Sequence, residues 1–173
     1  MQTWTLTPLQ KVRKIAGNIF QDTNLSKKFE NGTGNLIYKT ILMQRANLEK
    51  TRQKINCTDG TSIGISLDNE RKIHNGDVLQ GDDIMVLVKQ MPETVMRINL
   101  ASLEPKHLVT LGHMIGNLHK PVSVQDESVS IPVKSEIEID FIKTIFREFF
   151  DRAEFKIEEK IFEPSKFMDS HEH

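Results

Sequence analysis

The stretch Leu111-Gly112-His113-Met114-Ile115-Gly116-Asn117-Leu118-His119-Lys120-Pro121 joins an apolar helical pattern to a helix stop and a histidine. Gly116 and Asn117 favour the left-handed backbone found at helix C-termini, and Pro121 cannot extend a helix. We therefore expect the helix to end at Gly116-Asn117, with His119 at a fixed position just beyond it. Apolar residues at helical spacing predict its buried stripe: Leu108, Leu111, Ile115 and Leu118.

His119 carries a side chain that nickel, copper and zinc all accept, and a fixed backbone would present it outward. His113 lies about 240° away around a continuous helix, so the two imidazoles point apart. Two histidines chelate one ion from a single helix when they are four residues apart. The same residue of a second copy is the simplest further ligand, because a two-fold axis brings a surface against itself. On the residues alone, a solvated or structural histidine is the alternative.

The sequence Gly116-Asn117-x-His119 after an apolar helix, with Pro121 behind it, resembles the signature of the urease accessory nickel chaperones, the UreE family. The resemblance implies that His119 binds nickel near a homodimer axis. Because imidazole also accepts zinc and copper, we expect that either metal can substitute in vitro. It also implies two partners, the urease apoprotein complex and the urease accessory GTPase. We rank His113, which would lie against the partner copy, as a lesser metal candidate. Leu118 departs from the arginine that many members carry there.

The residues after Pro164 are polar and end with Ser170-His171-Glu172-His173. His171 and His173, with Glu172 or a terminal carboxylate, form a loose candidate metal site, and a solvated chain end is the alternative. Members of the family often carry a longer histidine-rich tail that stores or relays nickel. With two histidines here, we expect a small storage capacity.

The composition excludes several classes of protein. With 23 basic and 24 acidic side chains, the chain has no global charge to attract nucleic acid or an anionic membrane. Cys57 is the single cysteine, which excludes an intrachain disulfide and a thiolate-rich zinc site and fits a reducing compartment. The longest apolar run, 84–88, is far shorter than a membrane span, and no signal peptide is recognisable. We therefore expect a cytoplasmic protein.

Residues 1–92 contain short β-rich segments separated by turn residues. Asp59-Gly60 between apolar segments is a strong hairpin signal, and the turn His74-Asn75-Gly76-Asp77 precedes further β-rich segments. We predict a small, mostly antiparallel β-domain. This half also resembles the family's first domain, which is similar to the peptide-binding domain of J-domain co-chaperones. We interpret His74 as a solvated loop residue.

Met91-Pro92-Glu93 is the expected boundary, because proline ends strand pairing and the pattern changes after it. The pattern of residues 93–163 predicts six elements in the order strand, helix, strand, strand, helix, strand. With two right-handed crossovers this is a ferredoxin-like βαββαβ domain, and the fold class is α+β. We expect a helix cap near Ser102 and a capping box formed by Ser135 and Glu138. Residues 164–173 are the expected flexible tail.

Three functions are compatible with these patterns. The first is a homodimeric nickel carrier for urease assembly with an open histidine site. The second is a metal-dependent hydrolase, which needs three ligands and a base on each subunit, although no carboxylate lies in a motif with His113 or His119. The third is a metal-free peptide- or protein-binding chaperone module in which the first domain acts. The sequence has no Gly-Lys-Ser/Thr phosphate loop, and we do not expect an enzyme.

Overall fold

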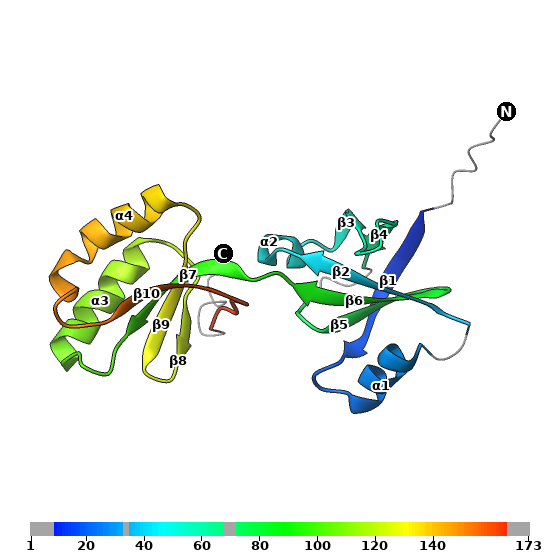
Figure 1. Cartoon of the computed structure of the whole chain (residues 1–173), viewed down its shortest axis with the longest axis horizontal. Coiled ribbons are helices and arrows are strands. Elements are labelled where there is room, and N and C mark those ends of the chain that lie inside the picture. Colours follow the sequence, from blue (N-terminus) through cyan, green and yellow to red (C-terminus); the bar gives the residue numbers. More distant parts are fainter. Residues whose placement is uncertain (1–8, 33–34, 68–71, 166–173) are drawn as a thin grey trace. The chain divides into compact units, whose positions relative to one another are not determined.

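The computed structural model describes residues 9–32, 35–67 and 72–165 (Figure 1). The chain divides into two compact units, Met1–Met91 and Pro92–His173. Each unit has its own sheet and its own hydrophobic core. Within the described ranges, every helix is too short or too polar to cross a bilayer.

The first unit is built on a six-stranded sheet that curls. Its elements are β1 (Gln10–Asn18), α1 (Thr23–Asn31), β2 (Ile37–Met43), α2 (Arg45–Leu48), β3 (Arg52–Asn56), β4 (Ser62–Ser66), β5 (Asp77–Gly81) and β6 (Ile84–Gln90). The strand order is β2-β6-β5-β1-β4-β3. β1 pairs in parallel with β4 and β2 in parallel with β6, whereas the other neighbours are antiparallel. A bridge between Ile41 and Cys57 links β2 to the residue after β3, which draws the two outer strands together.

The prediction of a mostly antiparallel domain is confirmed in part, because three of the five strand pairings are antiparallel and two are parallel. The hairpin at Asp59-Gly60 is confirmed, because β3 and β4 pair antiparallel with Asn56 opposite Ser62. The parallel neighbours β1 and β4 lie far apart in the sequence. Turn residues specify how adjacent strands pair, so they predict hairpins and leave the pairing of distant strands open.

Helix α1 is missing from the prediction, which places only strands in residues 1–92. Asp22 caps it by accepting from the N–H groups of Asn24 at 2.9 Å and Leu25 at 3.0 Å, and Gly32 ends it with a φ of 56°. Leu25 and Phe29, four residues apart, pack on the apolar residues of β5 and β6. An aspartate cap, an i, i+4 apolar pair and a glycine stop are therefore the overlooked signal.

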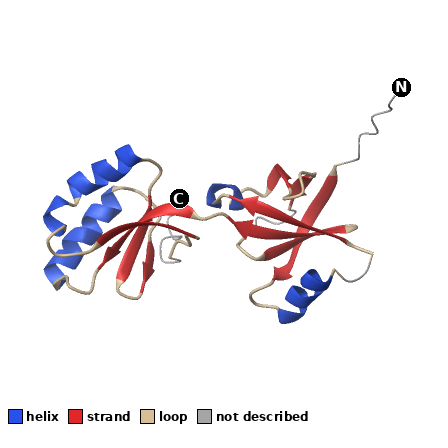
Figure 2. Cartoon of the chain, in the orientation of Figure 1, coloured by secondary structure: helices blue, strands red, loops and turns tan. Residues whose placement is uncertain are grey.

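The second unit has the predicted order of elements. They are β7 (Glu93–Asn99), α3 (Pro105–Asn117), β8 (Ser123–Gln125), β9 (Ser128–Pro132), α4 (Glu136–Ile145), the 3-10 turn η1 (Arg147–Phe149) and β10 (Phe155–Lys160). The sheet is antiparallel with the order β10-β7-β9-β8, so each helical crossover passes one intervening strand. Figure 2 shows α3 and α4 on the same face of this sheet. They share a core that includes Met96, Ile98, Leu111, Ile115, Ile131, Ile142, Phe146 and Phe149.

The start of α3 differs from the prediction. Glu104 is the N-cap and Pro105 the first helical residue, so the cap is not near Ser102. Ser102 Oγ instead donates to the carbonyl of Arg152 at 2.5 Å. Proline is compatible with the first position because amides of the first turn have no partner within the helix.

Candidate metal site

The helix α3 ends at Asn117, as predicted, but the left-handed residue is not the expected one. Gly116 and Asn117 stay helical, and the C-cap Leu118 keeps right-handed angles, with φ −76° and ψ −11°. The left-handed residue is His119 itself, with a φ of 49°. Its N–H donates to the carbonyl of Gly116 at 3.1 Å, and that of Leu118 to Ile115 at 3.0 Å. These bonds close the last turn of the helix. They form although the left-handed conformation costs an L-residue about 1–2 kcal/mol relative to the right-handed one.

The residue after His119 is fastened to two other elements. Lys120 Nζ donates to the carbonyl of Pro132 at 2.6 Å and pairs with Glu138 Oε1 at 2.6 Å. The Lys120 and Glu138 side chains are only 16% and 26% exposed, so the pair is largely shielded from water. The hydrogen bond from Lys120 is the main cause that holds the pKa of Glu138 below its ordinary value of 4.5. Strand β9 and helix α4 thereby fix the backbone on the C-terminal side of His119.

Glu138 also belongs to the first turn of α4. Its N–H donates to Ser135 Oγ at 3.2 Å, which confirms Ser135 as the cap. Its Oε2 accepts from the N–H of Lys134 at 2.5 Å instead of the N–H of Ser135, so the expected capping box forms only in part. Sequence reasoning found Glu138 as a capping residue and missed its partner Lys120. No spacing rule connects these two positions, because they lie on different elements.

His113 on α3 and His119 just beyond it differ in how free their rings are. Both side chains are exposed. Asn117 Nδ2 lies 3.2 Å from His113 Nε2. When the amide donates, Nε2 uses its lone pair to accept and the neutral ring carries its proton on Nδ1, so this hydrogen bond competes with metal binding by His113. In residues 9–32, 35–67 and 72–165, no three His, Cys, Asp or Glu side chains gather closely enough to hold an ion. His171 and His173 lie outside the described residues. The described part of one chain therefore offers exposed imidazoles without a complete ligand set.

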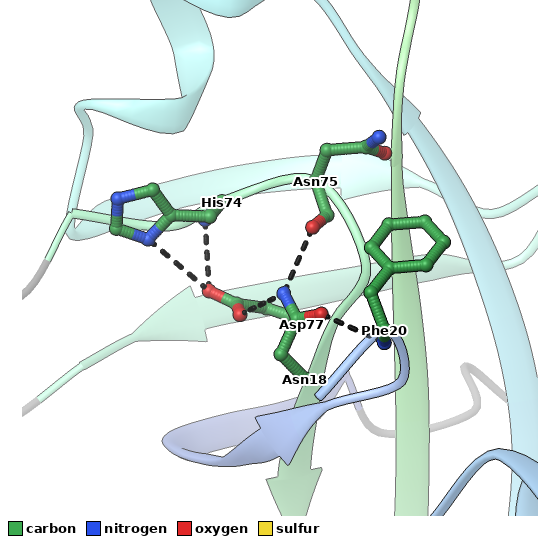
Figure 3. Close-up of polar contacts among 5 residues, drawn as sticks. All are labelled: Asn18, Phe20, His74, Asn75 and Asp77. Atoms are coloured by element: carbon green, nitrogen blue, oxygen red, sulfur yellow. Dashed lines mark hydrogen bonds and ion pairs between the residues drawn. The ribbon is translucent and has the colours of Figure 1, made fainter. Parts of the chain in front are cut away.

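His74, in the first unit, belongs to a polar cluster that ties β1 to the turn before β5 (Figure 3). Asp77 is buried and accepts from the backbone N–H of His74 at 2.8 Å and from Asn18 Nδ2 at 2.9 Å. Asn18 Nδ2 also donates to the carbonyl of Asn75 at 2.8 Å, and Asn18 Oδ1 accepts from the N–H of Phe20 at 2.9 Å. The imidazole lies with Nδ1 3.7 Å from Asp77 Oδ2 and is 73% exposed. The cluster is structural, and the His74 ring is solvated as expected.

The sequence matches known proteins over most of its length. Residues 13–89 match the family model described as the N-terminal domain of the UreE urease accessory protein. The urease accessory protein UreE of Yersinia rohdei is 32% identical over 132 residues, which cover 70% of this chain and 56% of the relative. Proteins of the same name from Yersinia pestis (strain Pestoides F) and Yersinia pseudotuberculosis (serotype O:1b, strain IP 31758) are also 32% identical over 132 residues, with 55% of each relative covered. The chain thus spans about half the length of these relatives. It belongs to the UreE family of urease accessory proteins.

Proposed function

We propose that this protein carries nickel for urease maturation and donates it to the urease apoprotein from an open site. In this proposal His119 and its counterpart in a second copy hold the ion at a homodimer axis. The observation that carries the proposal is an exposed imidazole whose backbone is bonded on one side to Gly116 and, through Lys120, to Pro132 and Glu138 on the other. A ligand that is already in place loses little freedom when it binds an ion. Membership of the UreE family supports the urease role.

Exposed apolar side chains on the two helices of the second unit support the homodimer. On α4, Ile137 is 83% exposed and Phe141, one helical turn later, is 59% exposed. Ile137 directly precedes Glu138, which is paired with the residue that follows His119. On α3, Val109 is 75% exposed. Large exposed apolar side chains favour a protein interface, and in this proposal a two-fold contact of the second unit brings the two His119 rings near each other.

The chemistry of such a site suits a carrier. Two imidazoles leave coordination positions for water or for His171 and His173, and an open site gives up its ion more readily than a closed four-ligand site. Zinc and copper would compete, because imidazole binds all three metals. The urease apoprotein complex and its accessory GTPase are the proposed partners, in the cytoplasm. The protein would act as a carrier and not as an enzyme.

Equilibrium dialysis against nickel, with the mass of the assembly measured alongside, tests this function. We expect the wild type to take up about one tightly bound ion per dimer. His119→Ala should remove the tight site and leave the circular dichroism spectrum unchanged, whereas His113→Ala, at an exposed neighbour on α3, should retain it. Deletion of residues 170–173 should remove only weaker sites.

The proposal is falsified if the His119→Ala dimer binds nickel as tightly as the wild type. A wild-type protein that takes up no nickel would instead favour the alternative, a metal-free peptide- or protein-binding module.

A further inference from the structure

His107, in the first turn of α3, contacts an arginine from a distant part of the second unit. The chain leaves η1 at Phe149 and turns toward β10, and Arg152 lies in this turn. Arg152 Nη1 donates to His107 Nε2 at 2.7 Å, although the two residues are 45 positions apart. The His107 side chain is 20% exposed. The contact therefore joins the start of α3 to the turn before β10.

This contact requires one protonation state of the imidazole. A guanidinium is always charged and carries only donor groups, so the hydrogen bond needs a lone pair on His107 Nε2. A neutral ring supplies this lone pair when its proton is on Nδ1, whereas a protonated ring carries hydrogen on both nitrogens and cannot accept. The bond between Arg152 and His107 therefore exists only while the imidazole is neutral.

The charged groups around the ring favour a change of partner when it is protonated. Glu104, the N-cap of α3, lies with Oε2 4.0 Å from His107 Nδ1. The same Oε2 pairs with Lys106 Nζ at 2.9 Å. A protonated ring is attracted by the Glu104 carboxylate and repelled by the Arg152 guanidinium. Protonation thus exchanges a partner in the turn before β10 for a partner at the start of α3 itself.

Two further contacts at the same place do not depend on the charge of the ring. Ser102 Oγ, in the loop before α3, donates to the carbonyl of Arg152 at 2.5 Å, and neither of these groups titrates near neutral pH. The His107 ring also lies edge-to-face on the buried Phe149, with the ring centroids 6.3 Å apart. Loss of the bond to the guanidinium therefore loosens the start of α3 without unfolding the unit.

We propose that His107 is a pH-sensitive latch between the start of α3 and the turn before β10. The latch is closed when Arg152 binds the neutral imidazole, and it opens in acid, where the protonated ring turns to Glu104. Imidazole suits this role because it is the side chain that ordinarily changes charge near neutral pH. The other end of α3, before His119, stays tied to β9 and α4 through Lys120. Acid would therefore loosen one end of the helix and leave the other end in place.

Urea unfolding of the full chain, followed through the backbone NMR signals of the second unit, tests the latch. The measurements are made at about pH 8 and about pH 5, on either side of the ordinary histidine pKa. Arg152→Met keeps the apolar stem and removes the donor groups. At the higher pH we expect it to raise the equilibrium constant for unfolding roughly threefold to tenfold, the usual contribution of one hydrogen bond. At the lower pH the change should be less than about twofold, because the wild-type bond is already lost.

Two further variants separate the latch from a general effect of charge. Arg147→Met is the matched control, because it removes the same group from an exposed position on η1. It should change the unfolding constant by less than about twofold at either pH. His107→Gln provides a carbonyl that can accept from Arg152 and does not titrate. In this background Arg152→Met should therefore have the same effect at both pH values.

Several outcomes would overturn the proposal. They are an effect of Arg152→Met that is absent at the higher pH, one that is equal at both pH values in the wild-type background, and an equal effect of Arg147→Met. A pH-dependent effect that persists in the His107→Gln background would also overturn it, because another group would then be titrating. The samples contain no nickel, so the outcome is independent of the function proposed for His119.

Discussion

At the scale of the residue, His119 combines a proposed ligand with an unfavourable backbone. Its φ of 49° lies in the left-handed region, which glycine enters freely and other L-residues enter at a cost. The hydrogen bond to Gly116 and the anchoring of Lys120 hold it there. Any side chain at this position strains the left-handed backbone, and the end of the helix does not require that strain. We therefore expect the His119 side chain to contribute to metal binding and not to the stability of the fold.

Two substitutions of His119 separate strain from binding. We expect His119→Gly to be more stable than His119→Ala by about 0.5–1 kcal/mol, because glycine relieves the left-handed strain that alanine retains. Both variants lack the imidazole, so neither should bind nickel tightly. Urea denaturation and nickel dialysis on the same samples measure the two effects. Equal stability of the two variants would contradict a left-handed backbone at this position.

At the scale of the element, the pair of Lys120 and Glu138 joins the end of α3 to the start of α4. Glu138→Gln should lower the free energy of unfolding at neutral pH by about 1–3 kcal/mol, because Lys120 keeps a shielded charge without its partner. The pKa of Glu138 is held below 4.5 in the folded state. The stabilisation by the carboxylate is therefore complete above that pH and is lost as the pH falls through the lowered pKa. The difference in the free energy of unfolding between the wild type and Glu138→Gln, which we call the gap, should therefore shrink in acid.

Urea unfolding at a series of pH values measures this gap. Asp140→Asn is the matched control, because it breaks a more exposed pair on the same helix, with Lys143 Nζ 3.7 Å from Asp140 Oδ1 and side chains 51% and 77% exposed. It should change the free energy of unfolding by less than about 0.5 kcal/mol. A gap for Glu138→Gln that stays constant from neutral to acid pH would show that the ionised carboxylate is not what stabilises the fold.

Substitutions at two glycines, one on β5 and one on α3, test how closely each element approaches its neighbours. A Cβ at Gly81 would lie 2.3 Å from the carbonyl oxygen of Lys11 on the neighbouring strand, whereas a Cβ at Gly112 on α3 would meet nothing within 4 Å. We expect Gly81→Ala to destabilise the first unit by about 1–3 kcal/mol, because β1 would have to move. Gly112→Ala should stabilise α3 by about 0.5–1 kcal/mol. Thermal unfolding of the two variants compares them, and a neutral Gly81→Ala would contradict the β1–β5 approach.

At the scale of the whole molecule, both cores are apolar and complete without an ion. Removal of metal with a chelator should therefore leave the far-ultraviolet circular dichroism unchanged. Nickel at about 100 times its dissociation constant should raise the free energy of unfolding of the second unit by about 2.7 kcal/mol, through preferential binding to the folded state. Calorimetry of the wild type and of His119→Ala measures the shift, which the variant should lack. Unfolding on chelation would point to a structural metal instead.

The sequence by itself determined the elements whose signals are local. The Asp59-Gly60 hairpin, the βαββαβ order, the cap at Ser135 and the end of α3 at Asn117 were all predictable, because turn residues, caps and hydrophobic periodicity act within a few positions. Helix α1 had such signals as well, and they were outweighed by the β-rich residues around it.

Only the tertiary structure decided which distant segments meet. It placed β1 beside β4 in parallel, chose Lys120 as the partner of Glu138, and aligned Lys11, Gly64 and Lys54 in one row. It also placed the left-handed backbone conformation at His119 and not at Gly116. These features depend on how strands and helices pack across long sequence separations, where no periodicity or spacing connects the residues that finally touch.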